Sequence, residues 1–150
     1  MQSDFLQNTL FGNNNKPFEE NADQDSITGF EWLSKDLVQV EAYINDPQCG
    51  FVLSPASLAQ MFAGMRQSAF PANVAAIKKN LPIYVLAGAD DPVHQEEAGL
   101  IKLVEAYRQT GLSVDYKLYP EGRHEMLNET NRVEVVAQLL EWLESALIDS

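Results

Sequence analysis

The chain has little cysteine: Cys49 is the only one in 150 residues. A single thiol excludes an intramolecular disulfide and a zinc site built from several cysteines. Cys49 lies in the segment Asp46–Gly50 (DPQCG), which has the composition of a turn after a helix. A catalytic thiol needs a basic partner, and none is close in sequence. We therefore expect Cys49 to be structural.

Long apolar runs are also missing. No stretch approaches the roughly 20 apolar residues of a membrane-spanning helix, and the polar N-terminus does not have the pattern of a signal peptide. Apolar residues still make up 45% of the chain, enough to form a core and to exclude wholesale disorder. These features predict a soluble, cytoplasmic protein with no stable membrane insertion.

Basic residues are scarce. Ten Lys and Arg face 22 Asp and Glu, which gives a net charge of −12. Residues 81–150 hold 13 of the acidic and 5 of the basic side chains, so the excess is larger in the second half. A surface this acidic repels phosphate backbones, which argues against nucleic acid as a partner and against a bare anionic membrane.

The first part of the chain, residues 1–80, has a helical pattern after an irregular start. Residues 1–25 are rich in Asn, Gln, Asp and Glu and predict no regular structure. One helix is expected from Ser34 to about Asn45, and a weak one over 71–79. Another begins at Ser54-Pro55, a favourable N-cap followed by proline. Four apolar residues follow it at helical spacing: Leu58, Met61, Phe62 and Met65.

From residue 81 onward strands alternate with helices. The apolar run 82–88 predicts a strand buried on both faces. A helix over 95–110 leads to an alternating strand over 113–119 with one wetter face, and Asn131 opens a last helix with a wide apolar side. This β-α-β-α order predicts parallel strands joined by a right-handed crossover. Ligands of such sheets bind beyond the carboxyl ends of the strands.

An acid and a histidine follow these two strands. Asp91 comes after the first strand and His124 after the second. In this arrangement hydrolases orient and use a general base. Asp90 is the alternative acid, Asp91 might only cap the next helix, and His124 might be a plain loop residue. A metal site that also uses His94 and Glu125 is a further alternative, although two histidines without a spaced ligand motif are weak evidence for zinc.

Four segments resemble a known family. Gly88–Val93 (GADDPV) and Tyr119–Glu125 (YPEGRHE) are similar to the C-terminal part of α/β-hydrolases of the serine aminopeptidase, monoacylglycerol lipase and lysophospholipase group. Phe30–Asp36 (FEWLSKD) and Asp46–Phe51 (DPQCGF) resemble the cap of the bacterial members. The resemblance spans about 11–147. It implies Asp91 as the acid and His124 as the base of a Ser-His-Asp triad, with neither metal nor cofactor.

One feature of that family is missing from the sequence. Its nucleophile sits in a G-x-S-x-G turn, and no such motif occurs here; Ser54, Ser57 and Ser68 have no flanking glycines at that spacing. We therefore expect an incomplete α/β-hydrolase fold, with a cap-like helical segment over 1–80 and the C-terminal part of the core over 81–150. A truncated gene, a proteolytic fragment and a split protein are the alternatives, and the isolated chain is expected to be inactive.

The resemblance implies a serine hydrolase of carboxylic esters that acts on a lysophospholipid or a monoacylglycerol. The acyl-enzyme would form on a serine that lies outside these 150 residues. The apolar residues Leu58, Met61, Phe62 and Met65 are candidates to cover the acyl chain. The alternative is a non-catalytic binding or assembly piece, which pairs through an exposed sheet edge with the missing half or with a second copy of itself.

Overall fold

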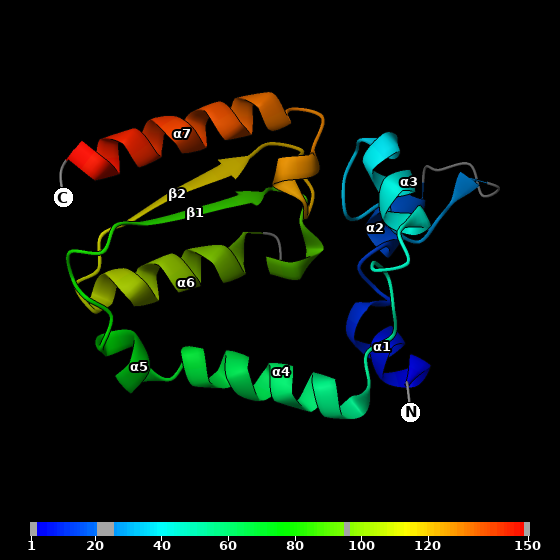
Figure 1. Ribbon diagram of the computed structural model, residues 1–150, viewed down its shortest axis with the longest axis horizontal. Coiled ribbons are helices and arrows are strands. Elements are labelled where there is room, and N and C mark those ends of the chain that lie inside the picture. The colour runs from blue at the N-terminus through cyan, green and yellow to red at the C-terminus, as the bar shows by residue number, and fades with distance from the viewer. Residues whose placement is uncertain (1–2, 21–25, 95–96, 149–150) are drawn as a thin grey trace.

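A two-stranded parallel sheet forms the centre of the fold in the computed structural model, which describes residues 3–20, 26–94 and 97–148. Strand β1 (Ile83–Gly88) pairs in register with β2 (Val114–Tyr119), from Ile83 opposite Val114 to Gly88 opposite Tyr119. Helix α6 (Ala98–Gln109) covers one face and α7 (Arg132–Ile148) the other (Figure 1). The predicted parallel β-α-β-α order is confirmed.

Side chains alternate between the two faces of the sheet. On the α6 side a core cluster contains Val104, Leu112 and Val114, with Ile83 and Val85 packed against it. The α7 side holds Tyr119, Met126 and Val135, with Leu86 against them. Tyr84 stacks on Trp142 of α7, with ring centroids 5.0 Å apart. Each helix therefore buries one strip of apolar residues against one face.

Two burial predictions were too strong. In β1 only Gly88 is fully buried, because the sheet has two strands and β1 has a strand partner on one edge only among the described residues. In α7 only Val135 is fully buried, whereas Leu140 is 54% exposed. Two strands are too narrow to cover the wide apolar side of a 17-residue helix. Both corrections have the same cause, which is the small width of the sheet.

The helix boundaries follow local capping chemistry. Ser54 caps α4 (Pro55–Ser68) by accepting from Ser57 N–H at 3.1 Å, as predicted. Gly111 has φ +83 and ends α6 in the left-handed conformation that glycine tolerates. The predicted start of α6 at Gln95 lies outside the described residues. The remaining short elements are α5 (Pro71–Ala75), η2 (Pro92–His94) and η3 (Met126–Asn128).

The N-terminal part differs from the prediction in two places. Residues 1–25 were expected to be irregular, yet they contain α1 (Asp4–Phe11) and α2 (Lys16–Glu19). Polar composition conceals α1, which begins at a Ser3 cap that accepts from Leu6 N–H. Helix α3 (Leu37–Asn45) is capped by Asp36 rather than by Ser34.

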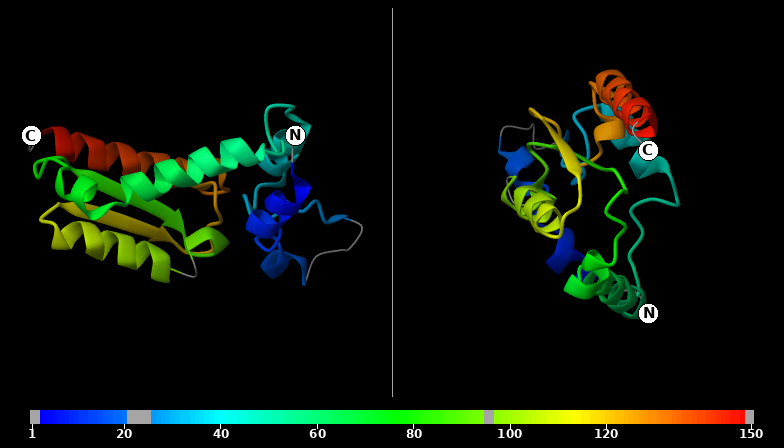
Figure 2. Two further views of the ribbon diagram at one scale, coloured as in Figure 1. Left: turned by 90° about the horizontal axis from the view of Figure 1, so that it is seen from below. Right: turned by 90° about the vertical axis from the view of Figure 1, so that its left-hand side faces the viewer.

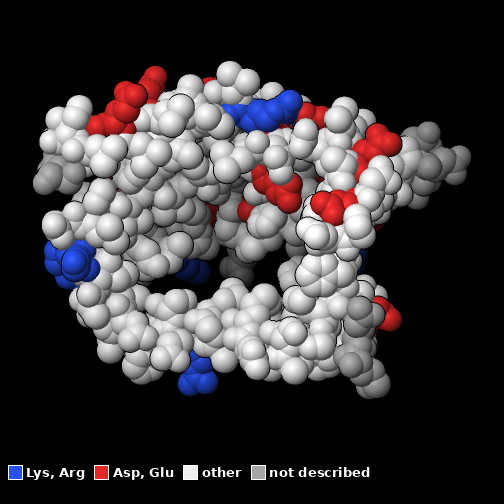
Figure 3. Space-filling model, viewed as in Figure 1, with Lys and Arg blue, Asp and Glu red and all other residues white. Residues whose placement is uncertain are grey.

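Helices α1 to α3 lie beyond the carboxyl ends of the strands, beside the loops that follow β1 and β2 (Figures 1 and 2). The long α4 then returns along the α6 side of the molecule, and the space-filling view shows an opening between it and the sheet unit (Figure 3). No helix among the described residues is long and apolar enough to cross a membrane. The N-terminal helices thus surround the end of the sheet at which ligands of parallel sheets bind.

Candidate active site

Two loops at the carboxyl ends of β1 and β2 pack backbone against backbone. Ala89 N–H donates to Tyr119 O at 2.9 Å, and Asp90 N–H donates to Gly122 O at 2.8 Å. A β-carbon on Gly88 would collide with the Gly122 carbonyl, so this approach requires glycine. The loops are therefore held at a fixed separation.

Asp91 is placed by this packing to face His124. Its Oδ2 lies 2.9 Å from His124 Nδ1, and its Oδ1 accepts from Val93 N–H at 2.9 Å. The side chain is only 9% exposed. The second bond also caps η2, so the capping role and the contact with histidine coexist in one residue. Asp90, the alternative acid, is exposed and makes no such contact.

The His124 ring is fixed on two sides. Because a carboxylate only accepts, Nδ1 carries the proton toward Asp91, and in the neutral ring Nε2 keeps a free lone pair. The Trp32 indole packs on the imidazole with centroids 4.9 Å apart, and His124 N–H donates to Trp32 O at 3.2 Å. The imidazole is 38% exposed. Such an orientation is suited to general-base chemistry.

The pair shifts the pKa of both members in the direction of an ion pair. Burial alone would raise the pKa of Asp91, but hydrogen bonds from His124 and Val93 N–H outweigh it and hold it below 3.8. The bond to Asp91 raises the pKa of His124 above 6.5 despite burial. The stabilisation from Asp91 is present above pH 3.8 and is lost as pH falls through its lowered pKa; that from His124 is present below pH 6.5 and is lost as pH rises through its raised pKa.

We expect Asp91→Asn to lower the pKa of the His124 imidazole, because it removes the charged acceptor that favours the imidazolium. The chain has two histidines, so an NMR titration of the ring Cε1–H signals resolves His124 directly. Asp90→Asn is the matched control, since it removes an equal charge from the adjacent, exposed position. Equal shifts in the two variants would show that the direct bond is not the cause.

His94 has both ring nitrogens engaged by backbone. Its Nε2 lies 2.6 Å from Gly88 O, and Glu97 N–H donates to its Nδ1 at 2.9 Å. A carbonyl accepts and an amide donates, so this ring is neutral with the proton on Nε2. Among the described residues no group of three or more His, Cys, Asp or Glu is placed to hold a metal ion. The geometry thus gives no support to the metal alternative.

The predicted apolar residues of α4 lie away from His124. Leu58 is buried, whereas Met61, Phe62 and Met65 are 37%, 42% and 57% exposed. None of the four lines the pocket beside Trp32, which has a volume of about 560 Å³ and is formed by α1, residues 29–32 and the segment around Cys49. Their role in covering an acyl chain stays a prediction.

Arg123 was expected to form a surface pair, but it is an internal link. Its guanidinium donates to Glu31 O at 2.6 Å and to Ser34 O at 3.2 Å, and it lies 4.3 Å from the centroid of the Phe18 ring. Burial lowers the pKa of Arg123, and the carboxylates of Glu129 and others oppose this. Arg123 therefore ties the histidine loop to the segment that carries Trp32.

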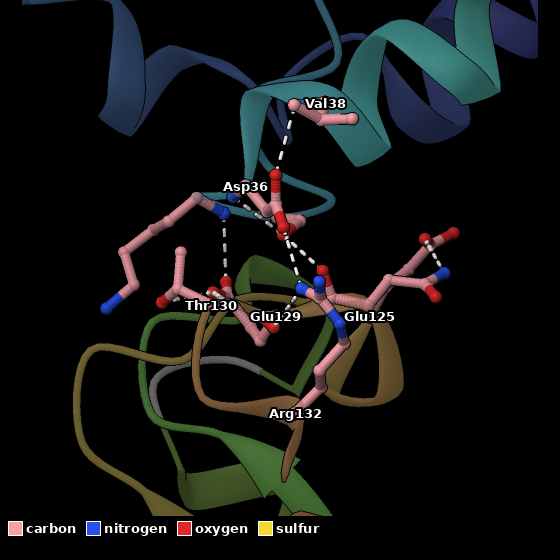
Figure 4. A network of polar contacts seen from close by, with 9 residues as sticks. Asp36, Val38, Glu125, Glu129, Thr130 and Arg132 are labelled. Carbon is pink, nitrogen blue, oxygen red and sulfur yellow. Dashed lines mark hydrogen bonds and ion pairs between the residues drawn. The ribbon is translucent and has the colours of Figure 1, made fainter.

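A network around Glu129 makes the same connection (Figure 4). Glu129 is fully buried, and its Oε1 accepts from Lys35 N–H at 3.0 Å and from Arg123 N–H at 3.2 Å. Its Oε2 accepts from Thr130 N–H at 2.8 Å. Arg132 pairs with Asp36 at 2.7 Å. The sequence gave no direct signal for this network, because its main acceptor is one of 22 acidic residues.

The capping-box spacing of Thr28 and Glu31 has an unexpected outcome. Glu31 Oε1 does accept from Thr28 N–H at 2.6 Å, but a turn follows rather than a helix. Burial would raise the pKa of Glu31, yet hydrogen bonds from Thr28 and Asn15 lower it to about 2. The motif therefore shapes the turn that leads to Trp32, whose N–H donates to Asn15 Oδ1.

Comparisons with known proteins agree with this architecture. The sequence profile of the family described as serine aminopeptidase, S33 matches residues 14–131. A thermostable carboxyl esterase from Bacillus coagulans, solved with glycerol, has a TM-score of 0.81 and 28% identity over 94% of this chain and 45% of its own. A lipase in an open form has a TM-score of 0.77 and 23% identity over 97% of this chain and 46% of its own. No curated protein sequence matches.

The chain thus spans under half the length of these two solved structures. The family match covers most of the chain and includes both Asp91 and His124. The predicted incomplete α/β-hydrolase architecture is confirmed by the neighbours and by the two-stranded parallel sheet with its helices. The chain belongs to the serine aminopeptidase S33 family of α/β-hydrolases.

Proposed function

We propose that this chain provides the acid and the base of a carboxylic ester hydrolase, Asp91 and His124. The observation that carries the proposal is the 2.9 Å contact between His124 Nδ1 and the buried carboxylate of Asp91, at the carboxyl ends of adjacent parallel strands. Hydrolases use this arrangement to orient an imidazole and to stabilise its cation. The nucleophilic serine is supplied from outside these 150 residues.

In the proposed reaction, His124 Nε2 takes the proton of the serine hydroxyl as its oxygen attacks the ester carbonyl. The imidazolium then gives that proton to the departing alcohol, which leaves an acyl-enzyme. Water next attacks the acyl group with His124 again as base, and the proton returns to the serine oxygen. Asp91 stays ionised throughout and holds the proton-bearing Nδ1 in place.

The proposed substrate is an ester with one acyl chain, a monoacylglycerol or a lysophospholipid. Support comes from the two structural neighbours, of which one is a carboxyl esterase solved with glycerol and the other a lipase. The chain also has an apolar pocket beside the ring of Trp32 that contacts His124.

We expect a fluorophosphonate probe to leave the isolated chain unlabelled, because no serine here has the G-x-S-x-G context of an activated nucleophile. Ser54 and Ser57 bond to each other, and Ser68 bonds to Met65 O, so the serines examined are engaged away from His124. Labelling is read by intact-mass spectrometry. Stoichiometric modification of one serine would overturn the view that the nucleophile comes from elsewhere.

A chimera provides the positive test. This chain would replace the part of the Bacillus coagulans esterase that it matches, so that the esterase supplies its own remaining 55% of sequence. We expect the purified chimera to be labelled by the probe and to hydrolyse monoacylglycerol. A chimera that folds by circular dichroism and is neither labelled nor active would contradict the proposal.

A second candidate function is assembly without catalysis, and the outer edge of β1 favours it. That edge has no strand partner among the described residues, so its backbone groups are able to pair with another strand. Sedimentation of the isolated chain distinguishes the two. A dimer that stays inactive in every chimera supports assembly, whereas a monomer together with an active chimera supports the hydrolase.

A further inference from the structure

We propose that the pocket beside Trp32 binds the acyl chain of the substrate, with the indole as a wall common to the pocket and to the base. This inference rests on the proposed hydrolase function and names the part of the site that selects the substrate. The pocket has a volume of about 560 Å³ and is open to solvent on one side. It lies at the end of the sheet where His124 is held.

The chemistry of the pocket is apolar and uncharged. Among the described residues none that lines it is Asp, Glu, Lys or Arg, although such residues make up 21% of the chain. Five aromatic rings dominate the lining: Phe11, Phe30, Trp32, Tyr43 and Phe51. An alkyl chain gains from burial against such a surface at about 25 cal/mol per Å², whereas a charged group would lose its hydration without a partner.

The walls of this pocket are held by contacts of their own. Phe30 and Tyr43 pack ring to ring with centroids 5.1 Å apart, and Tyr43 Oη accepts from Gly50 N–H at 3.1 Å. Gly50 has φ +62, which permits the turn that brings Cys49 and Phe51 to the lining. The pocket is thus built by the segment that the family resemblance marks as cap, not by the residues of α4 that we first expected.

A second pocket near the site has the opposite character. It has a volume of about 740 Å³ and is lined by Asp90, Asp91 and Arg123 together with Pro17 and Phe18. Burying an alkyl chain there would desolvate the charges of these side chains. The contrast favours the pocket beside Trp32 for the apolar end of the substrate.

Trp32 connects pocket and base. Its ring lies 4.9 Å from the His124 ring and also lines the pocket, and its carbonyl accepts the His124 N–H. A chain seated against this indole therefore places its ester end near the imidazole. A monoacylglycerol and a lysophospholipid each have one long apolar group, the acyl chain, so that group is the occupant.

Two intrinsic reporters make the test direct on the 150-residue chain. Cys49 is the only thiol and lines the pocket. Trp32 is one of two tryptophans; the other, Trp142, stacks on Tyr84 near the opposite end of the sheet. In a Trp142→Phe variant the fluorescence comes from Trp32 alone.

The probe is 1-O-octylglycerol, an ether that no esterase cleaves, used below the concentration at which it forms micelles. We expect it to slow alkylation of Cys49 by N-ethylmaleimide about tenfold at roughly ten times its dissociation constant, and to shift the emission of Trp32 over the same range. Glycerol alone is expected to do neither. An unchanged alkylation rate and unchanged emission would overturn the proposal.

Val52→Trp fills the pocket and is expected to abolish protection of Cys49 by the ether. The matched control is Val133→Trp, which makes the same change on α7 at a side chain that is 80% exposed and outside the pocket. The wild-type measurement stands even where the filled variant fails to fold. An active chimera whose Cys49 is not protected would refute the pocket and keep the hydrolase, whereas protection in an inactive chimera would do the reverse.

Discussion

His124→Gln is expected to reduce kcat of the chimera by about 10⁴ to 10⁶, the range found when a member of a catalytic triad is removed. The imidazole is the only group in the proposed reaction that both takes and returns a proton, and a neutral amide does neither. KM is expected to change little, because the side chain acts on the serine and the leaving group rather than on the bound chain. Steady-state hydrolysis of a monoacylglycerol measures both constants.

His94→Gln is the matched control for this prediction. It is the other histidine of the chain, it belongs to the loop after β1, and both of its ring nitrogens contact backbone. We expect this variant to keep kcat close to that of the parent chimera. Equal losses in the two variants would show that the loops fold poorly without histidine, and would remove the evidence that His124 acts as the base.

Glu129→Ala is expected to lower the free energy of unfolding by about 3 to 5 kcal/mol, a large part of the 5 to 15 kcal/mol of a typical domain. The carboxylate is fully buried and accepts from the N–H groups of Lys35, Arg123 and Thr130. Alanine leaves these donors without an acceptor in a dry site, and each such loss costs about 1 to 3 kcal/mol. Urea unfolding of the isolated chain measures the effect.

Glu121→Ala provides the comparison. Glu121 lies in the same loop and pairs with Lys35 at 3.7 Å, but its side chain is 84% exposed. An exposed pair at this distance adds little to stability, so we expect no measurable change. If the two variants lost stability equally, net charge rather than the buried hydrogen bonds would explain the result.

The second half of the fold was readable from sequence because its signals are local and agree with one another. The apolar run that ends at Gly88, the alternation before Tyr119 and the glycine after α6 each determine one element. Parallel pairing follows from their order along the chain. The Asp91–His124 contact was predictable for the same reason, since parallel strands place the loops that follow them side by side.

The rest depended on contacts between distant segments. Neither the polar stretch that contains α1 nor the shift of the α3 cap from Ser34 to Asp36 has a strong local signature. The Ser34 hydroxyl instead donates to Asn128 O, 94 residues away. Arg123 and Glu129 were hidden because side-chain type does not show which charged residues are buried. Periodicity found the apolar face of α4, but it does not show which apolar residues line a pocket.

The bonds between the Trp32 segment and the histidine loop restrict how a substrate can enter. His124 and Glu125 N–H donate to the carbonyls of Trp32 and Leu33, and Glu129 and Arg123 add buried links between the same two segments. A lid that swung outward at this point would pull on the backbone of the base itself. Movement that admits substrate while the base stays in place therefore belongs to other parts of the cap.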